Sequence, residues 1–417
     1  MKTIVILGSS SESCHIIRRA RDLGLRTVVV DANPEAPGFQ IADRVAIASC
    51  YHAEPAIREL ERIGKHYDGV LCACVDAPYV AAAVAERFGL PGLTPERAKL
   101  SMDKMEQKKV LRKQSIPVPD FGRMDKSFIH ENGLSIYCDP GNKAIGWWDF
   151  EFDENVVKPQ DSRGGRGVIR LRKNVEKGDV FIAYEQAKSQ SPTGRVMVEE
   201  WLDGPQLNSE SIIQDGRILF TALSWRNYAR LDEFAPHVIE DGLDIIQHNT
   251  ELYLRVNTVL TGAINALGWD RPMTVKGDLV IHKGQVHVIE LAARLSGGHY
   301  ATHTIPLAYG VPFVDCAIKF SLGEQAGAIA VSSDNYVSQR YVFPAPDDIG
   351  KTVVSVKALD GLVDYASWYI KPGDVIQPVR SHPDRWGQTI CMGRTESKAT
   401  ALAEWNIAEM KKGVVLE

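Results

Sequence analysis

Two acidic side chains twelve residues apart are the first feature of the sequence that could do chemistry. Asp278 and Glu290 flank the pair Lys283-Gly284, whose residue types favour the positive φ angles of a tight hairpin turn. In such a hairpin the two carboxylates lie nearly side by side, where they repel each other unless a cation separates them. Mg²⁺ with nucleotide phosphates is the usual cation, because it takes a few carboxylates together with phosphate and water oxygens. Arg294, four residues after Glu290, suits a carboxylate or phosphoryl group in transit. The alternative interpretation is a pair of exposed hairpin charges with solvated partners.

A loop rich in glycine and arginine follows a lysine that ends an apolar strand. Lys158 closes the strand predicted at 156–158, and residues 163–167 then contain three glycines and two arginines. Glycines let backbone N–H groups converge on phosphate oxygens, and basic side chains neutralise the phosphate charge. The spacing is not that of a P-loop. The sequence therefore predicts a different kind of phosphate-binding loop, with an ordinary hairpin as the alternative.

Two further motifs carry weaker signals. The turn that begins at Gly8 lacks the spaced glycines of a dinucleotide fingerprint, and Glu12 would place a negative charge near a phosphate. NAD or FAD binding is therefore disfavoured, even though Asp31 lies at a plausible distance for a ribose partner. His299 and His303 fall on one face of a predicted helix, but without the internal Glu of the zinc-protease motif they do not indicate a zinc site. A role for His299 beside a reacting group is the better interpretation.

The elements that must position these residues change character along the chain. The first ninety residues alternate between apolar strands (3–7, 26–30, 44–48, 69–75) and helices (15–23, 56–63, 79–88), which predicts a parallel sheet covered on both faces. The middle third predicts hairpins that turn at Asp215-Gly216 and Lys283-Gly284, with a helix at 250–267 between them. The last eighty residues predict short strands at 337–342, 352–358, 366–370 and 389–392 and a closing helix at 396–411. Segment 121–148 is irregular and polar, and no element or role is assigned to it.

Composition limits the function classes. The length of 417 residues suggests about three domains. The net charge of −5 argues against bulk binding to nucleic acid or to an anionic membrane, and no apolar run approaches the ~20 residues of a membrane span. The N-terminus lacks a signal-peptide pattern, and the seven cysteines include no CxxC pair, so a reducing cytoplasm is expected.

Together these features resemble the ATP-grasp superfamily, most closely its carboxylate–amine ligases in the carbamoyl-phosphate-synthase-like or amino-acid ligase branch. The resemblance spans nearly the whole chain, and its motifs, individually modest, are jointly specific because they occur in the expected order. In chain order they are Lys104, Lys158, the 163–167 loop, the 199–202 segment, Asp278, Glu290 and Arg294.

The resemblance implies a set of ATP-binding residues. Lys104 and Lys158 would neutralise the phosphates, and the lid loop over them would contribute Ser162, Gly164, Gly165 and Gly167. The hinge that reads the adenine edge would be Glu199, Glu200, Trp201 and Leu202. Gln206 occupies a slot that is usually acidic, with Glu210 four residues further on. Mg²⁺, with Mn²⁺ as a possible substitute, would be bound by Asp278 and Glu290.

The metal motif departs from the family pattern. Many members have Glu-x-Asn-x-Arg, in which the Asn binds metal, but this chain has Ala292 between Glu290 and Arg294, and alanine cannot coordinate an ion. Asp278 also takes a place often held by Glu. Two interpretations stay open: Glu290 bridges two ions, or one ion is held more by phosphate and water.

The implied fold is α/β. It comprises an N-terminal parallel-sheet domain (1–93), a central ATP-grasp module (94–330) with a small α+β lid at about 153–202, and a C-terminal β-rich subdomain (331–417). The implied reaction is ligation of a carboxylate to an amine through an acyl phosphate, with release of ADP, in cytoplasmic small-molecule biosynthesis, and the base rate of oligomers suggests a homodimer. Arg294 and Lys158 are the expected catalytic residues, and the expected substrate-binding residues are Arg226, Arg294, Ser296, Gly297, Gly298 and His299. The alternatives are an ATP-grasp enzyme that uses a thiol, hydroxyl or bicarbonate-type substrate, or a catalytically silent nucleotide-binding protein.

Overall fold

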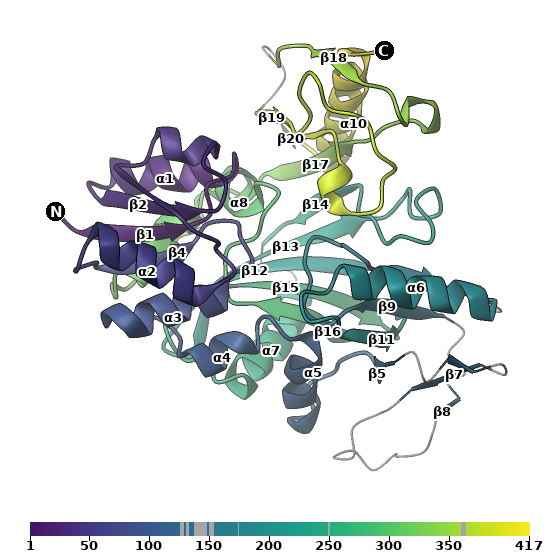
Figure 1. Cartoon of the computed structure of the whole chain (residues 1–417), viewed down its shortest axis with the longest axis horizontal. Helices are drawn as coiled ribbons and strands as arrows, with labels where there is room; N and C mark the ends of the chain where they lie inside the picture. Colours follow the sequence, from purple (N-terminus) through teal and green to yellow (C-terminus); the bar gives the residue numbers. More distant parts are fainter. Residues whose placement is uncertain are drawn as a thin grey trace.

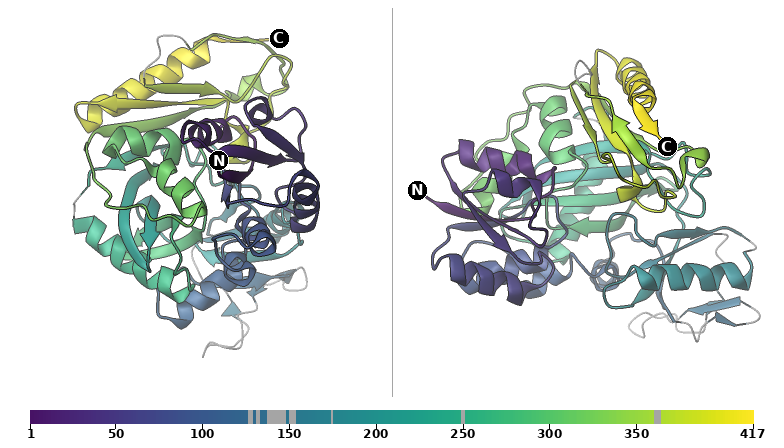
Figure 2. Two further views of the ribbon diagram at one scale, coloured as in Figure 1. Left: turned by 90° about the vertical axis from the view of Figure 1, so that its left-hand side faces the viewer. Right: turned by 45° about the horizontal axis from the view of Figure 1, so that its top comes forward.

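The computed structural model describes residues 1–125, 129–130, 133–136, 148–149, 154–173, 175–248, 251–359 and 364–417. As the sequence predicts, the fold is mixed α/β, with a parallel N-terminal sheet followed by antiparallel pairing in the described parts of the remaining chain (Figure 1). Figure 2 shows the N-terminal domain and the lid at opposite ends of a central sheet.

The N-terminal sheet is buried on both faces. Its strands run in the order β3-β2-β1-β4, with bounds β1 (Thr3–Leu7), β2 (Arg26–Asp31), β3 (Arg44–Ile47) and β4 (Gly69–Cys72). The helices between them are α1 (Ser13–Asp22), α2 (Ala53–Ile63) and α3 (Pro78–Phe88). Ile4 and Ile6 pack in the core that includes α1, whereas Val5 and Leu7 pack in the core that includes α2 and α3, because successive strand side chains point to opposite faces. The continuous apolar strands seen in the sequence follow from this two-sided burial.

The lid combines a small antiparallel sheet with one helix. Its strand order is β10-β9-β11-β5, formed by β5 (Phe121–Met124), β9 (Asn155–Pro159), β10 (Ile169–Leu171) and β11 (Val196–Glu200). Helix α6 (Lys177–Ser189) packs on this sheet through Ala183, Tyr184 and Ala187. Strand β5 lies in the segment that the sequence left unassigned, whose described remainder forms β6 (Ile129–His130), β7 (Gly133–Ile136) and β8 (Trp148–Asp149). The other residues of 121–148 lie outside the described chain.

The central sheet carries both predicted hairpins. Its strand order is β16-β15-β12-β13-β14-β17-β20-β19. The bounds are β12 (Gln206–Gln214), β13 (Arg217–Asn227), β14 (Gly242–Ile246), β15 (Met273–His282), β16 (Gln285–Ala292), β17 (Tyr336–Val342), β19 (Tyr365–Trp368) and β20 (Gly387–Gly393). The turns fall at Asp215-Gly216 and Lys283-Gly284, all four residues having positive φ, as the sequence predicted.

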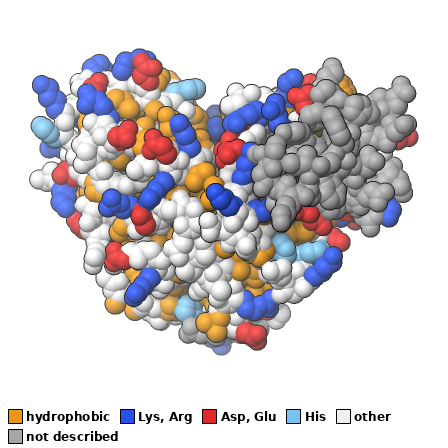
Figure 3. All heavy atoms as spheres, turned by 90° about the horizontal axis from the view of Figure 1, so that it is seen from below, with side chains coloured by type: hydrophobic (Ala, Val, Ile, Leu, Met, Phe, Trp, Pro, Cys, Tyr) orange, Lys and Arg blue, Asp and Glu red, His pale blue; other side chains and the backbone are white. Residues whose placement is uncertain are grey.

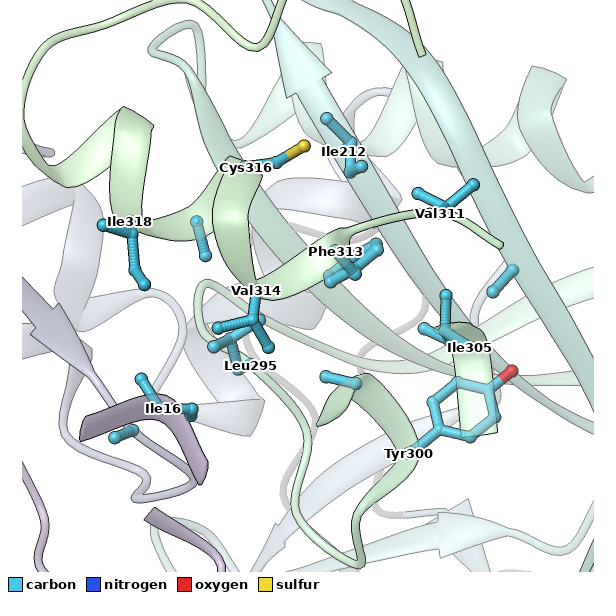
Figure 4. Close-up of a cluster of buried hydrophobic side chains, with 14 of the residues drawn as sticks. Ile16, Ile212, Leu295, Tyr300, Ile305, Val311, Phe313, Val314, Cys316 and Ile318 are labelled. Carbon is cyan, nitrogen blue, oxygen red and sulfur yellow. The ribbon is translucent and has the colours of Figure 1, made fainter. Parts of the chain in front are cut away.

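Helices cover the two faces of this sheet. Helix α7 (Glu251–Ala266) packs on one face through Tyr253, Val256 and Leu260. The other face packs against the π-helix η3 (Tyr300–Thr304), α8 (Ile305–Tyr309) and α9 (Phe313–Ser321). This second core also contains Ile16 of α1, so it joins the N-terminal domain to the central sheet; Figure 4 shows part of it.

The C-terminal strands extend the central sheet rather than forming a sheet of their own. Strand β17 pairs with β14, and β20 and β19 follow it, with α10 (Glu396–Lys412) packed on β17 and β20. A separate pair is formed by β18 (Val353–Val356) and β21 (Val414–Leu416). The short helices are α4 (Pro95–Lys99), α5 (Lys104–Lys113) and the 3₁₀ turns η1 (Pro37–Gln40), η4 (Pro346–Asp348) and η5 (His382–Asp384). No helix within the described ranges combines the length and apolarity that crossing a bilayer requires.

Candidate functional site

A cavity with a volume of about 810 Å³ lies where the N-terminal domain, the lid, the central sheet and the C-terminal segment meet. The turn 10–12, the glycine-rich loop 162–166, the carboxylates of the Lys283-Gly284 hairpin and the segment 382–385 all contribute to its lining. Seen from below, Lys and Arg side chains lie on both sides of the notch between the N-terminal lobe and the lid lobe (Figure 3). The chemistry-bearing residues of the sequence therefore converge on one hollow.

Two lysines share one buried glutamate on the lid side of the cavity. Glu199 on β11 forms ion pairs with Lys158 of β9, whose Nζ lies 2.7 Å from Oε2, and with Lys108 of α5, whose Nζ lies 3.3 Å from Oε1. Burial opposes ionisation of Glu199, but the two lysines outweigh it and hold the pKa of this carboxyl below its ordinary value. Burial lowers the pKa of Lys108 to about 8, against the opposing pull of Glu199. Sequence reasoning missed Lys108, although its position four residues after Lys104 places both on one face of the helix.

The predicted carboxylate pair is adjacent in the ladder. Asp278 on β15 pairs directly with Glu290 on β16, which confirms that the two carboxylates lie side by side. A β-bulge brings them together, because the pairing of Leu279 with Val288 would otherwise place Asp278 opposite Ile289. Asp278 Oδ2 lies 2.5 Å from Lys276 Nζ and its Oδ1 lies 2.9 Å from Arg226, while Glu290 Oε1 lies 3.2 Å from Lys104 Nζ. Burial would raise the pKa of Asp278, but Lys276 and Arg226 hold it well below its ordinary value. Asp278 is therefore held in its charged form, and both carboxylates lie among cations.

Arg294 joins the carboxylate pair to the N-terminal domain. It lines the cavity, and its Nε lies 3.4 Å from Asp76, which follows β4. Burial would lower the pKa of Arg294, but Asp76 and the neighbouring carboxylates raise it above its ordinary value. Lys104 of α5 contacts the glycine-rich loop in a similar way, because its Nζ donates to the carbonyl of Ser162 at 2.7 Å.

The remaining predicted nucleotide and substrate residues fall into two groups. Those that line the cavity are Ser162, Gly164, Gly165, Glu200, Trp201, Leu202, Gln206, Arg226, Ser296, Gly297 and Gly298. Gly167, Glu210 and His299 are not part of the lining. Gly167 packs against α6, where a Cβ would lie 3.1 Å from the Cα of Ala187.

Glu210 and His299 are held by neighbours behind the cavity wall. Glu210 accepts the backbone N–H of Ser296 at 2.9 Å and also the hydroxyl of Ser296, and burial raises its pKa to about 7. His299 Nε2 lies 3.0 Å from the hydroxyl of Tyr365, and burial lowers the pKa of His299 to about 3. Glu210 and His299 therefore hold neighbouring residues in position behind the cavity rather than contacting a ligand.

The C-terminal segment supplies cavity residues that sequence reasoning missed. The backbone N–H of His382 donates to the carbonyl of Gly164 at 3.0 Å, which ties this segment to the glycine-rich loop. The guanidinium of Arg385 lies 3.5 Å from the ring centroid of Tyr341 and donates to the carbonyl of Glu240 at 2.6 Å. No local motif marks these residues, because they reach the cavity only through the tertiary fold.

The donor set at the carboxylate pair fits Mg²⁺ better than a transition metal. Among the residues that the structure describes, no group of three or more His, Cys, Asp or Glu side chains could hold an ion. The two carboxylates of the hairpin lie side by side and offer oxygen ligands. Mg²⁺ binds to such a pair and completes its coordination with phosphate and water oxygens. Asp278 and Glu290 are the residues that would bind it.

The chain is similar to known proteins of this architecture, although no protein-family model matches it. A curated relative is the C-terminal section of the carbamoyl phosphate synthase large chain of Methanocaldococcus jannaschii, which is 22% identical over 352 residues, or 78% of this chain and 52% of the relative. The chain spans about half the length of the curated relatives it matches.

Two solved structures superimpose over the entire chain. An L-amino acid ligase from Bacillus licheniformis gives a TM-score of 0.74 at 17% identity, covering 100% of this chain and 98% of the other. The biotin carboxylase domain of the Hydrogenobacter thermophilus 2-oxoglutarate carboxylase, solved with MgADP and bicarbonate, gives 0.67 at 14% identity, covering 100% and 90%. The chain therefore has the fold of the ATP-grasp superfamily. The predicted resemblance to that superfamily and its carboxylate–amine ligases is confirmed.

The shared glutamate yields a stability prediction. Glu199→Gln leaves Lys108 and Lys158 buried without a charged partner, so we expect the free energy of unfolding to fall by about 3 kcal/mol. Urea unfolding followed by tryptophan fluorescence measures the loss. The exposed Glu185→Gln on α6 serves as the control and should change stability little. Equal stability of the two variants would contradict the charge-pairing account.

His299 yields a pH prediction. Its pKa falls from 6.5 to about 3 in the folded protein, so the unfolded chain takes up a proton first as the pH drops, and stability present above pH 6.5 is lost toward pH 3. We expect His299→Gln to remove about 2 kcal/mol of the stability lost between pH 6.5 and pH 5. Urea unfolding of both proteins across this pH range measures the difference. Parallel pH profiles would show that the imidazole is not held neutral.

Proposed function

We propose that the protein is an ATP-dependent ligase that activates a substrate carboxylate as an acyl phosphate and couples it to an amine, with release of ADP and phosphate, in small-molecule biosynthesis. The observation that carries the proposal is the convergence of widely separated segments on one cavity, whose lining includes Lys104, Lys158, the loop 162–166, Asp278, Glu290 and Arg294. The similarity to an L-amino acid ligase supports it.

The lysine–glutamate cluster suits a site that binds a triphosphate. Lys158 is 5% exposed and Lys108 is 1% exposed, so their charges cannot be satisfied by bulk water. When a phosphate takes Lys158 as its partner, Glu199 still has Lys108 beside it. The cluster can therefore exchange partners without leaving a buried charge unpaired. This makes Lys158 a phosphate-binding residue and Lys108 its support.

The proposed reaction uses the cations that line the cavity. A carboxylate oxygen of the substrate attacks the γ-phosphorus of ATP and the bond to the ADP oxygen breaks, giving an acyl phosphate. An amine then attacks the acyl carbon, phosphate leaves and the amine loses a proton. Lys158 and Arg294 stabilise the charge of the transferring phosphoryl group. Mg²⁺ (or Mn²⁺), bound at Asp278 and Glu290, would neutralise phosphate charge.

The cavity lining also carries one acidic and one basic side chain suited to an amino acid. Glu12 accepts the backbone N–H of Gly298 at 3.0 Å and lines the cavity, and burial raises its pKa. Arg385 is 7% exposed, and its Nε has no hydrogen-bond partner among the described residues. A carboxylate that takes no part in the reaction would pair with Arg385, and an amine would pair with Glu12. This arrangement favours amino acids as substrates.

The nucleotide role of Lys158 is tested by binding. Lys158→Ala removes one charged contact to a phosphate, so we expect about a tenfold loss of affinity for a non-hydrolysable ATP analogue, measured by calorimetry with Mg²⁺ present. Lys188→Ala, which changes an exposed lysine on α6, is the matched control and should bind normally. An unaltered affinity in Lys158→Ala would defeat its proposed role.

The reaction class is tested by substrate-dependent ADP release. We expect ADP to form from ATP when suitable amino acids are supplied in pairs, and to depend on both a free carboxylate and a free amine. A coupled ADP assay across all pairs of the common amino acids measures this, with the product identified by mass spectrometry. ADP release that requires bicarbonate, a thiol or an alcohol in place of the amine would assign a different ATP-grasp reaction. Nucleotide binding without turnover in every mixture would identify a silent protein.

A further inference from the structure

Three oxygen-bearing side chains form a row across the floor of the cavity. Asn208 on β12 pairs directly with Asp278 on β15, and Asp278 pairs directly with Glu290 on β16. Directly paired residues of neighbouring strands point to the same face of a sheet. All three line the cavity. Asp278 is therefore flanked by a carboxylate on one side and by an amide on the other.

The amide oxygen of Asn208 has no partner. The residue is 8% exposed, and within the described chain nothing donates a hydrogen bond to its buried Oδ1. The cations nearby are engaged elsewhere, since Arg226 contacts Glu240 and Asp278 and Lys276 contacts Asp278. A buried acceptor without a donor is unfavourable, so Asn208 Oδ1 is available to a donor or cation that enters the cavity.

The usual amide ligand is missing on the other side of Glu290. Ala292 lies two residues along β16, where the family motif places a metal-binding Asn, and it faces Lys276 across the ladder. A methyl group offers no lone pair to a metal ion. The side-chain amide that the motif lacks at 292 is present at 208, on the opposite flank of Asp278.

We propose that Asn208 Oδ1 is a ligand of the Mg²⁺ that accompanies the nucleotide, in place of the side chain lost at position 292. The inference rests on the proposed nucleotide site. Mg²⁺ accepts neutral amide oxygens together with carboxylates, so Asn208, Asp278 and Glu290 provide a compatible donor set. Because Lys104, Lys276 and Arg226 already balance the two carboxylates, the ion should bind with the phosphates and only weakly without them.

Mn²⁺ provides a direct probe, because electron paramagnetic resonance reports the free ion without any turnover. The full chain is titrated with Mn²⁺ in the presence of adenylyl imidodiphosphate. We expect Asn208→Ala to weaken Mn²⁺ binding at least tenfold, and the double variant Asn208→Ala with Ala292→Asn to recover most of that loss. Asn265→Ala, an exposed asparagine on α7, is the matched control, and Glu290→Gln is the positive control for loss of the ion.

Each outcome decides the inference. Wild-type Mn²⁺ affinity in Asn208→Ala overturns it, as does an equal loss of nucleotide affinity in EDTA, which would make Asn208 a nucleotide contact instead. If Asn208→Ala does not fold, Asn208→Ser, which keeps an oxygen on a shorter arm, is titrated in its place and must also bind Mn²⁺ more weakly. A wild-type chain that binds Mn²⁺ with the analogue but never releases ADP would overturn the ligase proposal and leave this inference standing.

Discussion

The pairing of buried charges is the constraint on which the rest of the structure depends. Lys158 and Lys108 hold Glu199, Lys104 reaches Glu290, and Lys276 flanks Asp278 at the same cavity. Leaving any one of these charges unpaired inside a protein is strongly unfavourable, so the side chains neutralise one another when no ligand is present. A triphosphate could pair with the lysines, and a divalent ion with the carboxylates, so every buried charge would keep a partner of opposite sign. Under the ligase proposal, the same balance that stabilises the cavity would prepare it for a nucleotide.

Cores far from the chemistry fix the positions of these charges. The hairpin that holds Asp278 and Glu290 is buried on the α7 side by Leu279 and Val288. The core shared by Ile16, Ile212 and Val314 joins the N-terminal domain to the central sheet (Figure 4). Because that core is apolar and buried, the turn with Glu12 keeps a fixed place opposite the lid. These two apolar cores hold the hairpin and the N-terminal domain in place. The cavity between them is lined by polar side chains of both.

The C-terminal segment contributes both to the central sheet and to the cavity. Strands β17, β20 and β19 continue the central sheet, so this part of the chain helps to form the fold that carries the site. It also closes the cavity, since His382 bonds to Gly164 of the lid loop and Arg385 stacks on Tyr341. A substrate beside His382 and Arg385 would therefore contact a segment that no sequence motif marks.

The sequence by itself determined whatever depends on local pattern. Apolar runs and hairpin residue pairs specified the parallel N-terminal sheet and both turns, because period and turn chemistry are properties of neighbouring residues. The spacing of Asp278 and Glu290 brought them near each other, but a β-bulge decided that they pair directly. Only the tertiary structure decided which charges meet. Lys108 and Asn208 are an ordinary helix lysine and strand asparagine in the sequence, and they become site residues because α5 packs behind β11 and β12 pairs with β15. The packing of segments far apart in the sequence brings these two residues to the site, and a local sequence pattern does not predict such packing.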